Sequence, residues 1–183
     1  MKYSINYIIS VRYLILILTF FTFSCSSKMN ISQFKDNKPE FILEDYFEGS
    51  VIAWGLFHDR FGNLRRQFKV DIEGTLADTQ LTLDEKFVYD DGEKQQRIWT
   101  IDILDGKKYV GRADDVIGSA TGSASGNALN WSYDLLLKIK DSTIKVRFDD
   151  WMFLQEKGVL INRAEVKKFG ITLGVVSITF LKL

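Results

Sequence analysis

The sequence predicts an all-β domain: an antiparallel, lipocalin-like up-and-down barrel of about eight to ten strands. Three observations lead to this fold class. Apolar and polar residues alternate in several separate runs, which is the two-residue period of half-buried strands. Turn sequences that contain Gly or Asp separate the runs. No window shows a convincing helical period, so helices are not expected to build the core.

Five runs carry the alternation most clearly. Their apolar rows are Phe68, Val70 and Ile72; Leu81, Leu83, Phe87 and Tyr89; Trp99, Ile101 and Ile103; Leu129, Trp131, Tyr133, Leu135 and Leu137; and Ile144, Val146 and Phe148. Turns such as Asp90-Asp91-Gly92 and Asp105-Gly106 lie between runs, and Asp-Gly in that position indicates a hairpin. A barrel removes the free edges of such a meander, and a two-sheet β-sandwich is the alternative architecture.

Two segments interrupt this pattern. Residues 41–47 are the best candidate for a short helical turn. The segment Gly118–Gly126 predicts either a glycine-rich turn at the rim of the barrel or a strand with a bulge. Because it lacks the Lys of a phosphate-binding loop and no strand-to-helix context surrounds it, no nucleotide is expected there. No cofactor is predicted from any other segment.

The first 24 residues differ from the rest of the chain. Lys2 and Arg12 are their only charged residues, residues 13–23 are mainly apolar, and the small Ser24 precedes Cys25. A basic start, a short apolar core and a small residue are typical of an export signal. We therefore expect Cys25 to be the acylated first residue of a bacterial lipoprotein. Ser26 rather than Asp follows it, which favours the outer membrane, facing the periplasm.

Two alternatives to a lipoprotein signal remain open. An uncleaved membrane helix would need about 20 apolar residues, and Arg12 interrupts the apolar stretch. Secretion without lipid would leave Cys25 without a role. Thr22 and Phe23 stand where an aliphatic residue and a small residue commonly precede the acylated Cys.

The predicted organisation has three parts: a signal peptide at 1–24, the acylated Cys with a flexible tether at 25–40, and a β-barrel at 41–183. The tether is polar and contains the only Pro of the chain, Pro39. As a flexible coil its 15 residues after the Cys, 26–40, would span roughly 20–23 Å. A first strand or short helix anchored by Ile31 and Phe34 is the alternative for this segment.

Composition excludes several classes of function. The chain has 183 residues, and its 24 basic and 24 acidic residues give zero net charge, whereas nucleic-acid binders are usually basic. One Cys cannot form an internal disulfide, and one Cys with one His makes a structural zinc site implausible, so no metal is predicted. A Ser-His-Asp or Cys-His site would have to use His58, beside a turn.

Several charged residues share the parity of the apolar rows. Arg66 precedes Phe68 in its row, Glu85 lies between Leu83 and Phe87, and Arg97 precedes Trp99. Buried charges need partners, so these residues predict either an internal Arg–carboxylate network or a polar pocket for a ligand with a charged or hydroxylated head. The candidate ligand-binding residues are Arg66, Glu85, Tyr89, Arg97, Trp99, Trp131, Tyr133 and Arg163.

Four carboxylates are weak candidates for catalysis. Asp149 and Asp150 are adjacent in a predicted strand, so they should point to opposite faces unless a bulge intervenes. Asp114 and Asp115 could supply a distant partner for a two-carboxylate site. The competing interpretation is that one Asp orients an arginine such as Arg163.

An ordered set of motifs runs through the chain. They are Tyr46-Phe47-x-Gly49, Asp59-Arg60-Phe61-Gly62, Phe87-Val88-Tyr89-Asp90-Asp91-Gly92-Glu93-Lys94-Gln95-Gln96-Arg97-x-Trp99, Gly111-x-Ala113-Asp114-Asp115-Val116-x-Gly118, Gly126-Asn127-Ala128-Leu129-Asn130-Trp131-x-Tyr133, Asp149-Asp150-Trp151-Met152, Asn162-Arg163-Ala164 and Lys168-Phe169-Gly170. Together they resemble a family of proteobacterial lipoproteins catalogued as domain of unknown function 3833. The resemblance covers Phe41–Leu183. It implies a lipocalin-like envelope lipoprotein with no established activity or catalytic residues, and it favours a lipid-related partner.

Three functions are therefore carried forward. The first is a membrane-anchored barrel that binds or carries a small amphipathic molecule, such as a lipid. The second is a structural or assembly role with a filled barrel and an external partner surface. The third is a hydrolase or isomerase that uses the Asp carboxylates. No nucleic-acid partner is expected, and no protein partner is identified.

Overall fold

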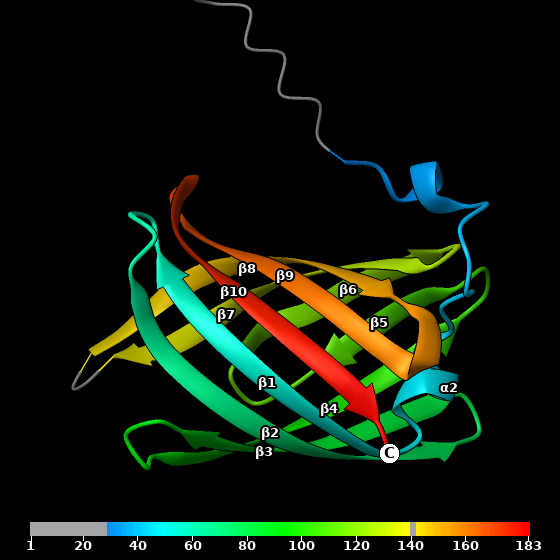
Figure 1. The fold of residues 1–183 in the computed structure, drawn as a ribbon, viewed down its shortest axis with the longest axis horizontal. Helices are drawn as coiled ribbons and strands as arrows, with labels where there is room; N and C mark the ends of the chain where they lie inside the picture. Colours follow the sequence, from blue (N-terminus) through cyan, green and yellow to red (C-terminus); the bar gives the residue numbers. More distant parts are fainter. Residues whose placement is uncertain (1–28, 140–141) are drawn as a thin grey trace, which may run out of the picture. The chain divides into compact units, whose positions relative to one another are not determined.

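Ten antiparallel strands close into a barrel in which every strand pairs with its neighbours in sequence and the last pairs with the first (Figure 1). This computed structural model describes residues 29–139 and 142–183. The strands are β1 (Gly49–Asp59), β2 (Leu64–Ala77), β3 (Gln80–Tyr89), β4 (Lys94–Leu104), β5 (Lys108–Arg112), β6 (Val116–Ser125), β7 (Ala128–Ile139), β8 (Ser142–Leu154), β9 (Val159–Lys168) and β10 (Ile171–Lys182). The predicted up-and-down barrel is confirmed, and the two-sheet sandwich is not formed.

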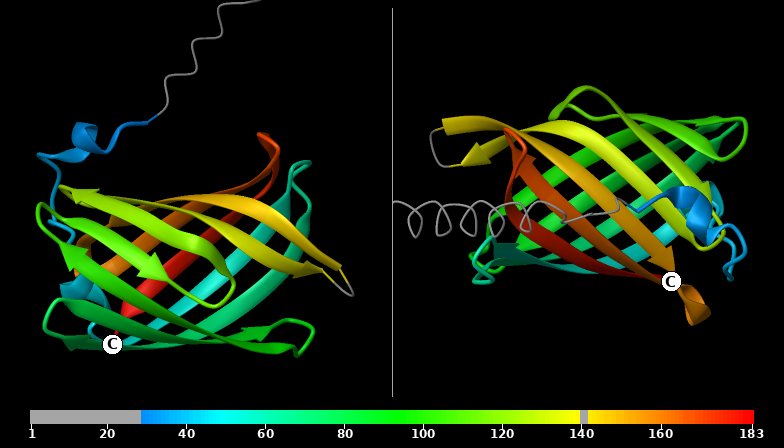
Figure 2. Two further views of the ribbon diagram at one scale, coloured as in Figure 1. Left: turned by 180° about the vertical axis from the view of Figure 1, so that it is seen from behind. Right: turned by 90° about the horizontal axis from the view of Figure 1, so that it is seen from above.

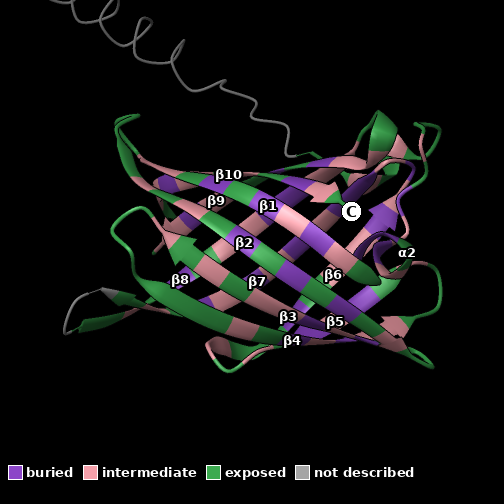
Figure 3. Ribbon diagram, turned by 60° about the horizontal axis from the view of Figure 1, so that its bottom comes forward, coloured by how far each residue is buried: buried purple, intermediate pink, exposed green. Residues whose placement is uncertain are grey.

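The strands form where the apolar rows predict them. Buried and exposed positions alternate along most strands, as the purple and green bands of Figure 3 show. One row of each strand therefore faces the interior and contributes to a single hydrophobic core. Because this core is built entirely from residues 41–180, the barrel is complete without the segment before it.

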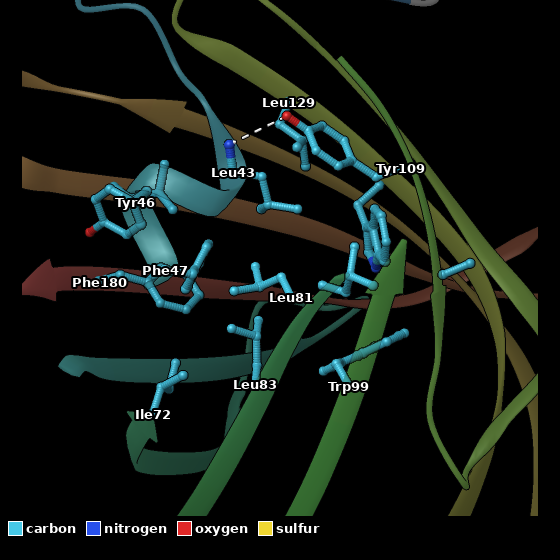
Figure 4. Close-up of a cluster of buried hydrophobic side chains, with 14 of the residues drawn as sticks. Leu43, Tyr46, Phe47, Ile72, Leu81, Leu83, Trp99, Tyr109, Leu129 and Phe180 are labelled. Carbon is cyan, nitrogen blue, oxygen red and sulfur yellow. Dashed lines mark hydrogen bonds between the residues drawn. The ribbon is translucent and has the colours of Figure 1, made fainter. Parts of the chain in front are cut away.

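A short helix, α2 (Leu43–Phe47), closes one end of the barrel. Leu43, Tyr46 and Phe47 are all buried, and the side chains of Leu43 and Phe47 lie toward Leu81 and Phe180, whereas the Tyr46 hydroxyl points away from Leu81 (Figure 4). Its backbone also fits closely, because a Cβ at Gly74 would stand only 1.7 Å from the carbonyl oxygen of Phe47. The helical turn predicted at 41–47 is thus confirmed, and it serves as a plug.

Tyr109 of β5 fixes the plug through hydrogen bonds. The backbone N–H of Leu43 donates to the Tyr109 hydroxyl at 3.4 Å, and that hydroxyl donates to a Glu44 carboxylate oxygen at 3.2 Å (Figure 4 shows the first). On the other side, the Tyr46 hydroxyl donates to the carbonyl of Gly158 at 2.9 Å. Gly158 belongs to the 3-10 turn η3 (Glu156–Gly158), which joins β8 to β9.

Residues 31–40 lie against the barrel, which corrects the predicted extent of the flexible tether. The 3-10 turn η2 (Ile31–Phe34) places the Phe34 ring 5.9 Å from Trp151 and 5.2 Å from Phe153, on the outer wall of β8. The N–H of Phe41 then donates to the carbonyl of Gly126 at 2.7 Å. The structure thus agrees with the alternative prediction for this segment, a short helix anchored by Phe34.

Glycines on the inner wall make room for aromatic rings. The Trp131 ring occupies the space where a Cβ of Gly111 or Gly122 would stand, at 2.5 and 2.2 Å. Gly122 lies in the segment 118–126, which forms most of β6, with an irregular register between Ile117 and Thr121. The strand-with-bulge prediction for this segment is confirmed.

The predicted signal peptide at 1–24 and Cys25 lie outside the described residues. Among the residues that the structure describes, no helix is long and apolar enough to cross a membrane.

Candidate functional site

The two halves of the barrel differ in how completely their interior is buried. Nine inward side chains near α2 are at most 6% exposed, and they define the closed half: Val51, Ile72, Leu81, Leu83, Ile101, Tyr109, Leu129, Leu160 and Phe180. The inward side chains toward the opposite end are only half-buried, and they define the mouth half: Phe57, Phe68, Glu85, Phe87, Tyr89, Arg97, Leu137, Ile144, Phe148 and Val176. The inner wall is therefore more open to solvent toward the mouth than toward the plugged end, where Leu76, Ile103 and Leu154 at the strand ends are partly exposed.

Arg97 of β4 is the central charge of the mouth half. Its Nε lies 3.1 and 3.0 Å from the two carboxylate oxygens of Asp115, and one terminal nitrogen lies 2.6 Å from Asp115 Oδ2. This is the bidentate arrangement that a guanidinium favours. The other terminal nitrogen is 3.9 Å from Glu85 Oε2. Although burial alone would lower the pKa of Arg97, the neighbouring carboxylates of Glu85 and Asp115 raise it.

The carboxyl group of Glu85, on β3, has a pKa near neutral pH. Burial raises its pKa to about 7, the Arg97 charge opposes this rise, and the Asp115 charge adds to it. Its side chain remains 15% exposed, so water moderates the effect. Glu85 and Arg97 face each other across the β3–β4 ladder, and their parity with the buried Leu83 and Trp99 places both on the inner wall.

A second group of polar side chains is more deeply enclosed. Asp150 of β8 is 5% exposed, and burial raises its pKa to about 7 against the opposing effects of the Tyr133 hydroxyl and the Asn162 carboxamide. Burial, reinforced by the Asp150 charge, holds the pKa of Tyr133 well above its usual value. The charge of Arg97 opposes the rise in the pKa of both Tyr133 and Asp150. These two residues therefore lie within electrostatic reach of the Arg97 side chain.

Asn162 of β9 is the unusual member of this group. It is 2% exposed, and neither the nitrogen nor the oxygen of its carboxamide makes a hydrogen bond of standard geometry among the described residues, although the carboxamide lies close enough to Asp150 to lower the pKa of that carboxyl. A buried, unpaired amide is uncommon in folded proteins and calls for an explanation. The sequence prediction omitted Asn162, although it shares parity with Leu160, Ala164 and Val166, all of which are buried.

Aromatic rings surround these polar groups. Tyr133 stacks on Phe148 with ring centroids 5.1 Å apart, and its ring meets the edge of Trp99 at 5.4 Å. Trp99 and Trp131 pack edge to face at 5.7 Å. The Arg97 guanidinium lies 5.6 Å from the centroid of the Phe87 ring. Four of the predicted ligand-binding residues, Arg97, Trp99, Trp131 and Tyr133, are thus brought together in the interior.

Arg66 and Tyr89 form a separate pair at the rim of the mouth. The Arg66 guanidinium lies 3.5 Å from the centroid of the Tyr89 ring. It also pairs with Asp91, at 3.4 Å, and with Glu93 in the β3–β4 turn. Burial raises the pKa of Tyr89, and the charge of Arg66 opposes that rise. The predicted Arg–carboxylate network therefore consists of an inner part at Arg97 and a rim part at Arg66.

Arg163 does not join the predicted ligand-binding residues. It lies on the outer wall of β9, where its guanidinium is 3.1 Å from Glu165, and its parity within the strand is opposite to that of Asn162. The prediction that included Arg163 is corrected accordingly.

The four candidate carboxylates occupy different places. Asp149 and Asp150 lie on opposite faces of β8 as predicted, with Asp149 accepting a hydrogen bond from Asn130 at 2.9 Å on the outer wall. Asp114 is exposed in the β5–β6 turn, and Asp115 is engaged by Arg97. Of these four, Asp150 alone is enclosed in the barrel. In the described part of the chain, no group of three or more His, Cys, Asp or Glu residues could hold a metal ion.

Comparison with protein families matches residues 19–182 to the family described as "Protein of unknown function (DUF3833)". The match covers nearly the whole chain and confirms the family resemblance seen in the motifs. No curated protein matches the chain.

Proposed function

Because the chain belongs to the DUF3833 family, whose description assigns no activity, we propose a function from the barrel itself: it binds a small amphipathic molecule through its mouth. The alkyl part would lie along the aromatic rings of the mouth half. The polar head would face Asn162 and Asp150. The observation that carries this proposal is the enclosed Asn162 carboxamide, whose two polar atoms make no hydrogen bond of standard geometry. Leaving such a group unpaired costs about 1–3 kcal/mol, which a hydrogen-bonding head group would recover.

The charges of the interior indicate which head groups fit. One cation, Arg97, faces three carboxyl groups, those of Glu85, Asp115 and Asp150. An anionic head would meet further negative charge whenever Glu85 and Asp150 are ionised, and like charges disfavour each other's ionised form. Neutral hydroxylated or cationic heads are therefore expected to bind more tightly than a carboxylate above neutral pH.

The same proposal places the protein in the bacterial envelope. Cys25 would carry the acyl chains, and two or more chains suffice for stable anchoring. The basic, apolar and small-residue order before Cys25 supports export, and Ser26 supports the outer membrane as the destination. The barrel would then stand in the periplasm, where a carrier of amphipathic molecules meets membrane-derived ligands.

The test uses residues 26–183, which contain the complete barrel and its core. Single-chain amphiphiles that share one alkyl chain and differ in head group (hydroxylated, quaternary ammonium or carboxylate) are titrated by calorimetry at pH 8. We expect saturable binding, with the carboxylate weakest. Asn162→Leu should lower the affinity at least tenfold, because it removes both polar atoms of the amide. A tenfold loss corresponds to about 1.4 kcal/mol of binding free energy.

The matched control is Arg163→Gln, which changes the neighbouring residue on the outer wall. It should bind like the unaltered protein. Absence of saturable binding with all three amphiphiles, or full affinity in Asn162→Leu, would contradict the proposal. Circular dichroism of each variant verifies that the barrel is folded.

A structural or assembly role is the second candidate. It is favoured by exposed apolar side chains on the outer wall, where Trp54 of β1 and Ile161 of β9 both lie opposite Thr179 of β10. Trp54→Ser together with Ile161→Ser should then reduce assembly with a partner while leaving ligand titrations unchanged. The two candidate functions thus predict different sensitive residues.

A further inference from the structure

Two hairpin tips at the mouth end expose large aromatic rings. Phe61, in the β1–β2 turn, is 75% exposed, and Phe169, in the β9–β10 turn, is 92% exposed. The two tips lie side by side at the end of the barrel opposite α2 (Figures 1 and 2). A hydrogen bond from the Arg60 N–H to the Leu173 carbonyl, at 2.9 Å, ties one hairpin to the other. The two hairpins that carry these rings are thus joined at one corner of the barrel.

Phe169 is in a backbone conformation that disfavours it. Its φ is 50° and that of the following Gly170 is 77°, so both turn residues occupy the left-handed region. Tight hairpin turns of this kind prefer Asn-Gly, because a bulky residue with positive φ is strained. A ring that is both strained and exposed gains nothing from packing within the barrel. The ring is therefore free to contact a surface outside the domain.

Each exposed ring is accompanied by a cation. The Arg60 guanidinium lies 4.8 Å from the Phe61 ring centroid, and the Lys168 ammonium lies 5.5 Å from that of Phe169. Neither cation forms an ion pair within 29–139 and 142–183. The acids beside them are already engaged, Asp59 by Arg65 and Glu165 by Lys167. Arg60 and Lys168 are therefore available to an external anion.

The rim of the mouth is asymmetric in charge. Residues 59–65 and 165–171 each contain two basic residues and one acid, so the two tips together carry a net charge of +2, in a chain whose net charge is zero. The β3–β4 turn on another part of the rim carries Asp90, Asp91 and Glu93, which outnumber the two cations beside them, Lys94 and Arg66. One corner of the mouth is thus basic and aromatic, and another corner is acidic.

We propose that the two tips dock the mouth of the barrel onto the surface of an anionic lipid bilayer. Phe61 and Phe169 would enter the interface between head groups and acyl chains, and Arg60 and Lys168 would meet the lipid phosphates. The acidic corner would be repelled and stay in water, so the barrel would sit at a tilt. This surface goes beyond the proposed ligand site and does not depend on it.

The bilayer is favoured over a protein partner by the charge of the corner and its small size. Two rings on two turns offer little area for a stable protein interface, which buries about 800 Å² on each side. The same rings suit an interface that accepts single apolar side chains at any lateral position. Basic residues beside them are attracted to the negative surface potential of anionic lipids.

The test is co-sedimentation of residues 26–183 with vesicles at low salt. Vesicles of phosphatidylethanolamine with phosphatidylglycerol are compared with vesicles of phosphatidylcholine alone. We expect binding to the anionic vesicles only. The double variant Phe61→Ser/Phe169→Ser should lower the bound fraction at equal lipid at least tenfold, and Arg60→Gln/Lys168→Gln should remove the dependence on phosphatidylglycerol content.

The matched control is Ile98→Ser, which removes an exposed apolar side chain from the outer wall of β4. It should bind like the unaltered barrel. Failure of the unaltered barrel to sediment with anionic vesicles would overturn the proposal, as would sedimentation that neither double variant weakens. Self-association that the Phe variants abolish, without vesicle binding, would also overturn it and assign the corner to a protein contact.

Discussion

The closed half and the mouth half of the barrel use the same strands for different purposes. Toward α2, the inner wall is aliphatic and aromatic and is sealed by Leu43, Tyr46 and Phe47. Toward the mouth, the same rows of β3 and β4 change to Glu85 and Arg97 and remain partly open to solvent. The side chains that stabilise the barrel most by burial lie at the plugged end, whereas the charged groups that oppose folding lie toward the mouth.

The mouth half pays an energetic cost that the closed half avoids. Burying a charge or an unpaired amide opposes folding, whereas burying alkyl surface favours it by about 25 cal/mol per Å². Ion pairing to Asp115 offsets the cost for Arg97. Deeper in the barrel, next to Leu160 in the inward row of β9, the Asn162 carboxamide makes no hydrogen bond of standard geometry. Destabilising groups that persist in an otherwise well-packed barrel are expected at a functional site.

The largest expected effect is on the free energy of unfolding, when one phenylalanine of the plug and one of the mouth half are each replaced by alanine. Phe47→Ala empties a fully enclosed site in the plug and should lower the free energy of unfolding by about 3–5 kcal/mol. Phe87→Ala, at a half-buried position in the mouth, should cost about half as much, because water can fill the space. Urea unfolding measures both, and equal losses would contradict the division into two halves.

Substitutions of Arg97 and Arg66 compare how much the inner ion pairs and the rim ion pairs contribute to stability. Arg97→Gln leaves Glu85 and Asp115 without their cation, and we expect a loss of about 2–3 kcal/mol, less than for a fully buried pair because the Arg97 side chain is 23% exposed. Arg66→Gln breaks pairs with exposed acids and should cost under about 1 kcal/mol. Urea midpoints at pH 8 give both values. A similar effect of the two substitutions would show that Arg97 is not enclosed.

The pH dependence of stability tests the two carboxyl groups whose pKa burial raises to about 7, Glu85 and Asp150. In the unfolded chain such groups have a pKa near 4, so the native state binds more protons between about pH 4 and 7. Stability should therefore fall as pH rises from 5 to 8, by about 2 kcal/mol per carboxyl. Asp59, whose pKa is lowered to about 2, is ionised in both states over this range and contributes nothing there.

Asp150→Asn should remove more of this slope than Glu85→Gln, because Asp150 is the more enclosed of the two. The measurement is urea unfolding at several pH values between 5 and 8. Stability that rises over this interval, or a slope that neither substitution reduces, would contradict the burial of these groups.

The smallest effect is expected at the exposed corner of the mouth. Phe169→Asn places a residue that tolerates positive φ in the β9–β10 turn and should stabilise the barrel by about 0.5–1 kcal/mol. The same substitution should weaken vesicle binding. Gly170→Ala, which introduces a Cβ at the neighbouring positive φ, should instead destabilise the turn, and thermal unfolding distinguishes the two. Destabilisation by Phe169→Asn would show that the ring contributes to the fold.

Much of this structure could be predicted from the sequence because alternation encodes it. The rows that contain Val70, Leu83, Ile101, Trp131 and Val146 all face inward, and closure of the meander follows from the need to pair its edges. The inward positions of Glu85 and Arg97 followed from the same parity. A two-residue period thus specifies both the core and the charges placed within it.

The remaining features depend on contacts between distant parts of the chain. Asp115 meets Arg97 only because the β5–β6 turn folds over the mouth, across 18 residues. Residues 31–40 are polar and predict a tether, but Phe34 packs on Trp151 and Phe153, more than 100 residues away along the chain. Asn162 escaped prediction because its row, with Leu160, Ala164 and Val166, is not among the five runs in which the alternation is clearest.

The central claim, that the mouth half holds an amphipathic ligand, is tested most directly by nuclear magnetic resonance of residues 26–183 titrated with the hydroxylated amphiphile. Amide and side-chain shifts should move at inward residues of the mouth half, at Asp150 and at the Asn162 carboxamide. Those of Leu81, Leu129 and Leu160 in the closed half should stay in place. Shifts confined to the outer wall, or an Asn162 carboxamide that does not respond, would contradict the account.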